Sequence, residues 1–398
     1  MGFICYHCRM KFIKLFIALP FILALNSCQK DPDLSAGSRN FKLAFGEHLE
    51  TSGNASAITT SGAILSVGTQ ISPNNSSTML YLQKCNSAGQ SLWEKTYGGE
   101  KNEIGADILL NPDGTIMILG HTASFGAGLN DIYIVKTDEN GNIIWEKTIG
   151  GPANDFARKI KPAANNHFYI GGYTQSYGKG GLDFYLAKID ALGNLIWQKT
   201  YGDVLDDGLV DFYITENGEL MLFGFTNNYE TEEQDFLLIK TDPNGGLIWQ
   251  KTYGGFSYEE PQAISRCADG NFVLAGHTAS LGDLEHDVYV IKVDLEGEVI
   301  WQKTCGIMNH HEGAMNVLAS NSGLIYVLAR GHHIDNAYLY KLNPEGELLN
   351  MNKFGGEKFD ILYGIVEHSN SLILTGFTES YSKHPEKKTN LFLVKTDK

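Results

Sequence analysis

Cysteine is scarce in this chain, and its distribution speaks against a disulfide-stapled fold. The sequence has six cysteines. Three of them, Cys85, Cys267 and Cys305, lie in different copies of the repeat described below and in different predicted strands, so they suggest no disulfide pairing. We expect these three to be buried free thiols.

Basic charge is also in short supply. The chain has 31 lysines and arginines against 46 aspartates and glutamates, which gives a formal net charge of −15. Residues 1–27 contain Arg9, Lys11 and Lys14 and no acid, so their removal makes the balance more acidic still. A chain of this charge repels phosphate backbones, which argues against nucleic acid as a partner.

Helical periodicity and familiar catalytic motifs are missing as well. No segment repeats its apolar residues at helical spacing over a sustained stretch. The chain has no nucleophile elbow, no phosphate-binding loop, no zinc-binding helix and no spaced Ser/His/Asp set. Its many carboxylates leave a glycosidase or lyase pair open, but no spacing selects one.

The N-terminus has the pattern of a targeting segment. Lys11 and Lys14 form a basic region, and residues 15–25 are apolar. This apolar run is short for a bilayer span, which favours a signal peptide over residues 1–27 rather than an uncleaved anchor. Met10 is the expected true start, because Met10-Lys11 begins an ordinary signal sequence.

Leu25-Asn26-Ser27-Cys28 resembles the bacterial lipobox, and this resemblance implies that Cys28 is lipidated, for example with palmitate. Residues 28–39 then form the lipidated cysteine and a polar, flexible tether. The acidic run that directly follows Cys28 is similar to the export signal of some surface lipoproteins. We therefore expect an outer-membrane lipoprotein that is held by its lipid and faces the cell surface, with the periplasm as the alternative.

A tryptophan-containing segment organises the rest of the chain. Trp145–Gly151 has the sequence Trp-Glu-Lys-Thr-Ile-Gly-Gly. Related segments recur every 52 residues, starting at Trp93, Trp145, Trp197, Trp249 and Trp301. Two degenerate copies start at Phe41 and Asn350. Seven copies at a nearly fixed period indicate one supersecondary unit that is repeated.

Each repeat reads as four short strands, here called A to D. In the second repeat they are residues 104–110, 115–120 and 131–136 and a run that starts at 143. Asn/Asp-Gly turns join A to B and C to D, and a longer loop joins B to C. A four-stranded meander repeated at this length is typical of a β-propeller blade.

The two ends of the chain predict how the ring closes. The last repeat has only three strands, at 361–367, 371–376 and 391–395, whereas residues 40–46 form a strand D without a blade. Pairing the two removes both exposed sheet edges. We expect residues 40–398 to form an all-β, monomeric, seven-bladed propeller with four-stranded antiparallel blades. A six- or eight-bladed ring or an open solenoid is the alternative.

Two columns of the repeat are read as framework. The strand-D tryptophans are expected to pack between neighbouring blades, with sugar stacking as the alternative. A lysine ends strand C in every repeat, and we expect it to be a solvated charge beside a capped turn. These lysines are Lys84, Lys136, Lys188, Lys240, Lys292, Lys341 and Lys395.

The segment Lys136–Trp145 resembles the tryptophan-docking motif of quinoprotein-like propellers, in which a Gly-containing turn leads to a strand-D tryptophan. With Trp-x-Lys-Thr-x-Gly-Gly added, the repeats are similar to bacterial β-propeller repeats of secreted proteins and lipoproteins of unassigned function. The resemblance implies the fold. Quinoprotein dehydrogenases also carry adjacent cysteines, which this chain lacks, and that speaks against a quinone-dependent dehydrogenase.

The D–A and B–C loops share one face of a propeller, and here they are longer and more varied than the turns on the other face. We expect binding at that face. An acidic column lies ten residues after the start of each marker segment, with Thr51 and His311 in the two other slots. It either rings the channel mouth as a cation site or caps the amides of the D–A loops. Its members are Glu103, Asp155, Asp207, Glu259 and Asp360.

One repeat has paired histidines in both loops of this face. The D–A loop contains His310, His311 and Glu312, and the B–C loop contains His332, His333 and Asp335. Imidazoles with nearby carboxylates suit zinc or another divalent metal, so these residues are the candidate metal site, and solvated loop histidines are the alternative. No other cofactor is indicated.

The sequence therefore supports two functions. The first is a lipid-anchored scaffold that binds a protein or a glycan through the D–A and B–C loops. The second is a propeller enzyme, a hydrolase or a lyase, that acts on polysaccharide.

Overall fold

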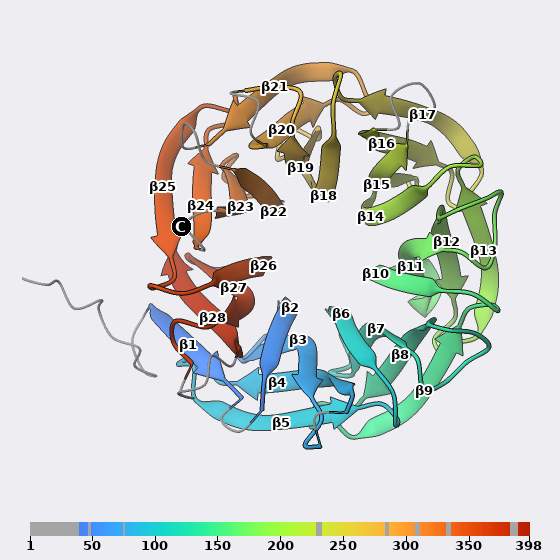
Figure 1. Ribbon diagram of the computed structural model, residues 1–398, viewed down its shortest axis with the longest axis vertical. Coiled ribbons are helices and arrows are strands. Elements are labelled where there is room, and N and C mark those ends of the chain that lie inside the picture. Colours follow the sequence, from blue (N-terminus) through green and yellow to red (C-terminus); the bar gives the residue numbers. More distant parts are fainter. Residues whose placement is uncertain are drawn as a thin grey trace, which may run out of the picture. The chain divides into compact units, whose positions relative to one another are not determined.

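The computed structural model describes residues 40–46, 49–74, 76–227, 233–282, 286–306, 311–331, 336–382 and 389–398. Within these residues the chain forms seven four-stranded antiparallel sheets arranged as blades around a central channel (Figure 1). In six blades the four strands pair in sequence order, and in the seventh the outer strand is β1; strand A lines the channel and strand D lies on the outer rim in every blade. The predicted all-β, seven-bladed propeller is confirmed.

The strands have closely similar lengths from blade to blade. The A strands are β2 (Thr51–Ile58), β6 (Glu103–Leu110), β10 (Asp155–Pro162), β14 (Asp207–Ile214), β18 (Glu259–Arg266), β22 (Glu312–Ala319) and β26 (Asp360–His368). The B strands are β3 (Ile64–Ile71), β7 (Ile116–Thr122), β11 (Phe168–Thr174), β15 (Leu220–Asn227), β19 (Phe272–Thr278), β23 (Ile325–Gly331) and β27 (Ser371–Thr378). The C strands are β4 (Thr78–Cys85), β8 (Asp131–Thr137), β12 (Asp183–Ile189), β16 (Gln234–Thr241), β20 (Asp287–Val293), β24 (Ala337–Leu342) and β28 (Asn390–Asp397). The D strands are β5 (Ser91–Tyr97), β9 (Ile143–Ile149), β13 (Leu195–Tyr201), β17 (Leu247–Tyr253), β21 (Val299–Cys305), β25 (Leu348–Phe354) and β1 (Phe41–Phe45). A single 3₁₀ turn, η1 (Ala164–Asn166), joins β10 to β11.

The ring closes through the N-terminal strand. β1 pairs with β28 in an antiparallel register that runs from Phe41 opposite Lys395 to Phe45 opposite Leu391, and it completes the sheet of β26 and β27. Phe41 is only 2% exposed and packs with Tyr81 of the first blade. The predicted closure is confirmed, because β1 and β28 pair with each other and neither strand is left without a partner.

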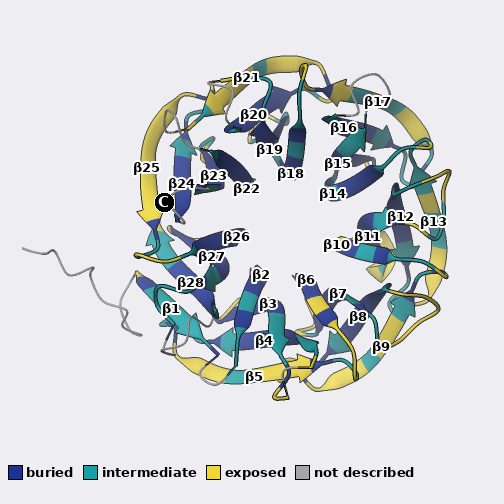
Figure 2. Cartoon of the chain, viewed as in Figure 1, coloured by how far each residue is buried: buried dark blue, intermediate teal, exposed yellow. Residues whose placement is uncertain are grey.

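The hydrophobic core lies between neighbouring blades. The B and C strands are buried along most of their length, whereas the D strands are exposed along the rim (Figure 2). One apolar cluster joins Leu119 and Ile134 of one blade to Ile170 and Ala187 of the next. Because each core is shared, a blade gains most of its burial from its neighbours, as expected for a repeat architecture.

The outer strands are sheet edges, and each of the six that follow strand C directly carries a lysine that discourages pairing with another chain. These lysines are Lys95, Lys147, Lys199, Lys251, Lys303 and Lys353.

The thiols of Cys85, Cys267 and Cys305 are free; Cys85 is buried and the other two are half-buried. Burial raises the pKa of Cys85 to about 12. Within the described residues, no helix has the length and apolar character to cross a bilayer.

Candidate ligand site in the central channel

The five tryptophans lie on the rim, each against the C–D turn of the following blade. Trp145 illustrates the contact: a Cβ on Gly193, the turn glycine of the next blade, would lie 2.8 Å from Trp145 Cη2. Gly193 has φ +79°, so glycine is required there by both backbone and space. Trp93, Trp197, Trp249 and Trp301 meet Gly141, Gly245, Gly297 and Gly346 in the same way. The geometry is that of inter-blade packing.

The lysines that end strand C differ from the expectation of a solvated charge. Lys84 Nζ donates a hydrogen bond to Glu139 O in the C–D turn of the next blade, and Lys292 Nζ donates to Pro344 O in the corresponding turn. Lys292 is buried and also pairs with Asp269 at 2.7 Å. The expectation was wrong for Lys292, which is buried among these partners, whereas the hydrogen bond of Lys84 is exposed to solvent.

The acidic column lies at the start of strand A, and each carboxylate is buried and bonded within its own blade. Glu103 accepts a hydrogen bond from Gly99 N in the D–A loop and one of 2.7 Å from Thr122 Oγ1 on strand B. Asp155, Glu259 and Asp360 accept the corresponding bonds, and so does Asp207 from Asp203 N. Burial raises the pKa of Asp207. This is capping geometry, with the carboxylate oxygens committed to protein donors.

The structure corrects the slot assigned to His311. Strand β22 begins at Glu312, and Glu312 is fully buried and accepts a hydrogen bond from Tyr340 OH. One more residue separates Trp301, on strand D of the fifth blade, from strand A of the sixth blade than in the other repeats, so the acidic column shifts from His311 to Glu312. Thr51 holds the slot in the first blade, where its hydroxyl donates to Phe45 O.

The predicted metal residues fall largely outside the described part of the chain. His310, His332, His333 and Asp335 lie outside the described residues, whereas His311 and Glu312 lie within them. The His311 ring lies 5.5 Å from that of His286. Within the described ranges no group of three or more His, Cys, Asp or Glu side chains converges as metal ligands.

Every A strand carries a β-bulge, and the seven bulged residues meet in one place. The pairing of strands A and B skips one residue per blade, for example Arg158, between Ala157 and Lys159. A bulge re-aims the side chain of the extra residue. All seven bulged residues line one cavity of about 330 Å³ in the channel. They are Asn54, Ala106, Arg158, Val210, Gln262, Met315 and Tyr363.

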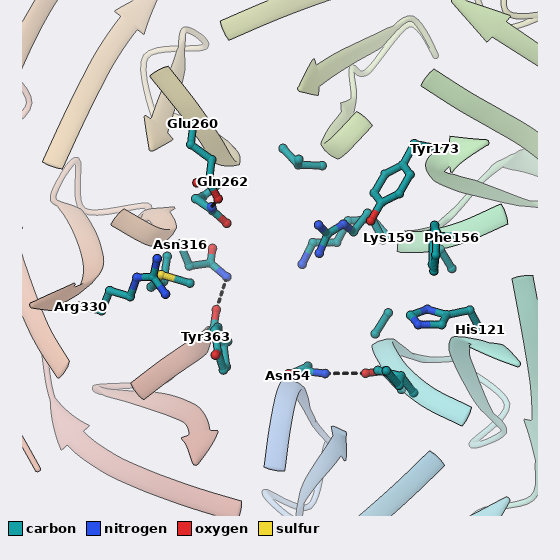
Figure 3. A pocket seen from close by; sticks show the side chains of 17 residues that line it. Asn54, His121, Phe156, Lys159, Tyr173, Glu260, Gln262, Asn316, Arg330 and Tyr363 are labelled. Atoms are coloured by element: carbon teal, nitrogen blue, oxygen red, sulfur yellow. Dashed lines mark hydrogen bonds between the residues drawn. The ribbon is translucent and has the colours of Figure 1, made fainter. Parts of the chain in front are cut away.

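The cavity opens at the end of the channel bordered by the D–A and B–C loops. The bulges follow the first residues of the A strands, and the B strands contribute residues near their ends, namely His121, Tyr173 and Arg330. Figure 3 shows His121, Phe156 and Tyr173 on one side of the cavity and Glu260, Arg330 and Tyr363 on the other. The cavity is lined by residues of the A and B strands, whereas the sequence predicted binding by the loops of this end of the propeller; that prediction stays a prediction.

Two of the polar residues in the cavity wall join neighbouring blades. Asn54 Nδ2 donates to Gly105 O of the second blade at 2.6 Å, and Asn316 Nδ2 donates to Tyr363 O of the seventh at 2.7 Å (Figure 3). Deeper in the channel, Asp107 accepts from Ile160 N of the third blade. These bonds fix the blades around the cavity, so its shape is set before any ligand binds.

One wall combines a neutral histidine with an aromatic and a cation. His121 packs edge-on against Phe156, with 5.0 Å between ring centres, and Phe156 packs against Tyr173. The Arg158 guanidinium lies 5.4 Å from the centre of the Tyr173 ring. Burial, with a smaller effect of the Arg158 charge, lowers the pKa of His121 to about 4, so its imidazole is neutral at pH 7. A perturbed histidine in a cavity is a candidate functional group.

The opposite wall holds a hydrogen-bonded carboxylate. Glu260 Oε2 lies 3.1 Å from His277 Nε2 and accepts from Tyr258 OH, while Gln262 Nε2 donates to Oε1 at 2.7 Å. The hydrogen bond with His277 lowers the pKa of Glu260 to about 2. His277 fits because Gly313 has no side chain; a Cβ there would lie 2.9 Å from His277 Nδ1.

The seven bulged residues were not identified from the sequence, although their spacing is visible there. Positions 54, 106, 158, 210 and 262 are spaced by 52 residues, like the framework columns, and 315 and 363 continue the series. The tryptophan and carboxylate columns keep one residue type or charge in most repeats, whereas this column has seven different residues.

Comparisons with known proteins support the fold and leave the activity open. No protein-family model matches the chain. The regulatory protein FlaEY of Caulobacter vibrioides is 22% identical over 239 residues, which cover 54% of this chain and 24% of that protein. The match thus spans about a quarter of that relative's length.

Two solved structures have a similar architecture. Puromycin hydrolase superposes with a TM-score of 0.57 at 13% identity, over 87% of this chain and 52% of that chain. The polysaccharide lyase Uly1 superposes with a TM-score of 0.55 at 10% identity, over 87% of this chain and 90% of that chain. At these identities the likeness defines a β-propeller and nothing finer.

Proposed function

We propose that this protein is a binding scaffold that holds a glycan in the mouth of its central channel. One observation carries the proposal: seven bulged positions bring seven different residues to a single cavity, while the rim tryptophans and the capping carboxylates recur from blade to blade. The cavity is therefore lined asymmetrically, as a site for one particular ligand requires.

The cavity lining has the chemistry that sugars require. Phe156, Tyr173 and Tyr363 offer aromatic surface to the apolar faces of sugar rings. Gln262 and the guanidinium of Arg158 offer donors to hydroxyl groups. The structural likeness to a polysaccharide lyase supports a propeller as a frame for a glycan, and a protein ligand is the competing outcome of the test.

The test is a glycan array probed with the mature chain, the Tyr173→Ala variant and the Tyr363→Ala variant. We expect binding to a defined group of glycans that falls roughly tenfold or more in each variant, as for loss of an aromatic contact of about 1.4 kcal/mol or more. Ile144→Ala is the matched control, because this residue of the outer strand β9 is 53% exposed and does not line the cavity. A blank array, together with capture of a cell-envelope protein, would replace the glycan with a protein partner.

A second candidate function is an enzyme that acts on polysaccharide. His121, Tyr173 and Arg158 place a neutral imidazole, a phenol and a guanidinium in one wall, and a proton acceptor beside a proton donor is what acid–base chemistry uses. The glycans that bind are incubated with the protein, and new chain ends are measured. Turnover that His121→Gln abolishes while binding persists would make the enzyme the better account.

The lipid anchor belongs to the same proposal. Lipidation of Cys28 would hold the propeller at the outer membrane, with the channel mouth available to envelope or external glycans. Metabolic fatty-acid labelling should mark the wild type and not Cys28→Ala. Protease treatment of intact cells then separates a surface location from a periplasmic one. Label retained in Cys28→Ala would refute the assignment.

A further inference from the structure

Arginine is rare in this protein, and its placement is uneven. The described residues include three arginines, Arg158, Arg266 and Arg330. Arg266 lies away from the channel mouth and pairs with Glu216 at 3.0 Å. The other two line the channel cavity, and neither has an ion-pair partner within 4 Å among the described residues. In a chain with a net charge of −15, this cavity thus brings together two guanidiniums that have no direct ion pair.

On the third blade, the neighbouring acids are already committed to other cations. Asp211 pairs with Lys161 at 3.2 Å and accepts from Ile264 N, and Asp107 accepts from Ile160 N. Burial opposes the charge of Lys159, but these two carboxylates outweigh it and raise the pKa of Lys159. Arg158 itself is exposed to the cavity and contacts the Tyr173 ring, so its donors remain available.

On the sixth blade, Arg330 pairs across strands with Gly313 and lies near Glu260. The Glu260 carboxylate is engaged by His277, Tyr258 and Gln262 and makes no hydrogen bond to the Arg330 guanidinium. Arg330 Nε is buried and has no hydrogen-bond partner among the described residues. The Arg330 side chain as a whole is half-buried and lines the cavity, so a ligand oxygen would meet the other two guanidinium nitrogens, which also make no hydrogen bond among the described residues.

Both arginines line one cavity, Arg158 from blade three and Arg330 from blade six, and these two blades lie on opposite sides of the propeller (Figure 1). Guanidinium groups bind carboxylates and sulfates through paired, charge-assisted hydrogen bonds. We infer that the ligand is an acidic glycan that carries at least two anionic groups, one bound by Arg158 and the other by Arg330. This inference rests on the proposed function and specifies the substrate class of the same site.

The aromatic residues between the two arginines complete the site. Tyr173 lies beside Arg158, and Tyr363 lies on the wall of Arg330, so each anionic group would be adjacent to an aromatic face that can pack against its sugar ring. A neutral glycan could use the aromatics but would leave both guanidiniums unpaired. The expected preference is therefore for polyanionic chains over neutral chains of the same length.

The experiment measures binding by calorimetry with four oligosaccharides of matched length: a uronate polymer, a sulfated neutral polymer, a chain with a single uronate and an uncharged chain. The wild type should bind a chain with several anionic groups most tightly. Arg158→Gln and Arg330→Gln should each weaken that binding roughly 10- to 100-fold, as expected for loss of a charged hydrogen bond. Arg266→Gln is the matched control and should bind like the wild type. The uronate and the sulfated polymer then distinguish carboxylate from sulfate.

The outcomes separate this inference from the proposed function. If the uncharged chain binds as tightly as the charged chains, and neither channel variant weakens it, the anionic ligand is wrong while glycan binding stands. If the single-uronate chain binds as tightly as the polyanions, two-point recognition is wrong. If no oligosaccharide binds at all, both fail. Thermal unfolding of each variant verifies that a loss of binding is not a loss of fold.

Discussion

The rim and the channel mouth of this propeller are built from the same repeat, yet they differ in how far the repeat is kept. On the rim, five tryptophans meet five turn glycines in the same contact. At the channel mouth, the seven bulged positions carry seven different residues. Uniform contacts suit a ring in which every blade must fit the next, and the variety suits a site that must fit one ligand.

The comparison also separates two kinds of polar residue on the channel side. The carboxylates at the start of strand A recur because each one caps a loop of its own blade, as Glu103 does for Gly99. The bulged residues, which lie three positions after these carboxylates, need not recur; Arg158 and Gln262 are examples. Recurrence therefore indicates a structural role even for buried charge, and departure from it indicates the site.

The largest effect should come from opening the ring. Deletion of residues 40–46 removes β1, exposes the edge of β28 and takes away Phe41, so we expect a loss of at least about 5 kcal/mol in the free energy of unfolding. Chemical denaturation measures this. Deletion of residues 29–39 is the control and should leave stability unchanged. Equal stability of the two deletion variants would contradict closure by β1.

Removal of a rim contact should destabilise the protein less than deletion of β1, but more than substitution of an exposed residue on the same strand. Trp197 packs against Gly245 of the next blade and lies 5.8 Å from the ring of Tyr169, so Trp197→Ala should destabilise the protein by about 2–4 kcal/mol. The adjacent Ile196 is 46% exposed, and Ile196→Ala should change stability by less than about 0.5 kcal/mol. Similar losses for both substitutions would remove the distinction between framework and surface on the rim.

The channel wall should make stability depend on pH. The pKa of His121 is about 4, below its ordinary value of 6.5, so the unfolded chain takes up a proton before the folded protein does. His121 therefore contributes full stability above pH 6.5 and loses it as the pH falls towards 4, by up to about 3 kcal/mol. Denaturation midpoints across this range should fall more steeply in the wild type than in His121→Gln. Parallel curves would mean that His121 is not held neutral by the fold.

The smallest effect on stability should come from substitution of a bulged residue in the channel. Arg158 is exposed to the cavity, and its one described contact is with Tyr173, so Arg158→Gln should change the free energy of unfolding by less than about 1 kcal/mol. Thermal unfolding measures this beside Trp197→Ala. A loss of stability as large as that of Trp197→Ala would mean that Arg158 stabilises the fold instead of serving only the ligand site.

The fold was open to prediction because it depends on recurring residues. The 52-residue spacing of Trp93 to Trp301 indicated the blades, and the missing fourth strand of the last repeat indicated the closure with Phe41–Phe45. The slot of His311 was misassigned because one extra residue between Trp301 of the fifth blade and strand A of the sixth moved the acidic column to Glu312.

The site was harder to predict because it depends on strand register. A bulge is set by how strands A and B pair, and nothing in the local sequence around Arg158 or Met315 marks the residue that loses its partner. The pairing of Glu260 with His277 likewise joins residues that meet only across strands. The metal interpretation of the paired histidines stays a prediction.

The central claim is that the seven bulged residues bind the ligand, while the recurring residues of the blades only hold them in position. Its most direct test is one variant with Arg158, Gln262, Met315 and Tyr363 all changed to alanine, compared with the wild type for thermal stability and for its glycan-array profile. The account predicts a folded propeller that has lost its glycan binding. An unchanged array profile in this folded variant would contradict it.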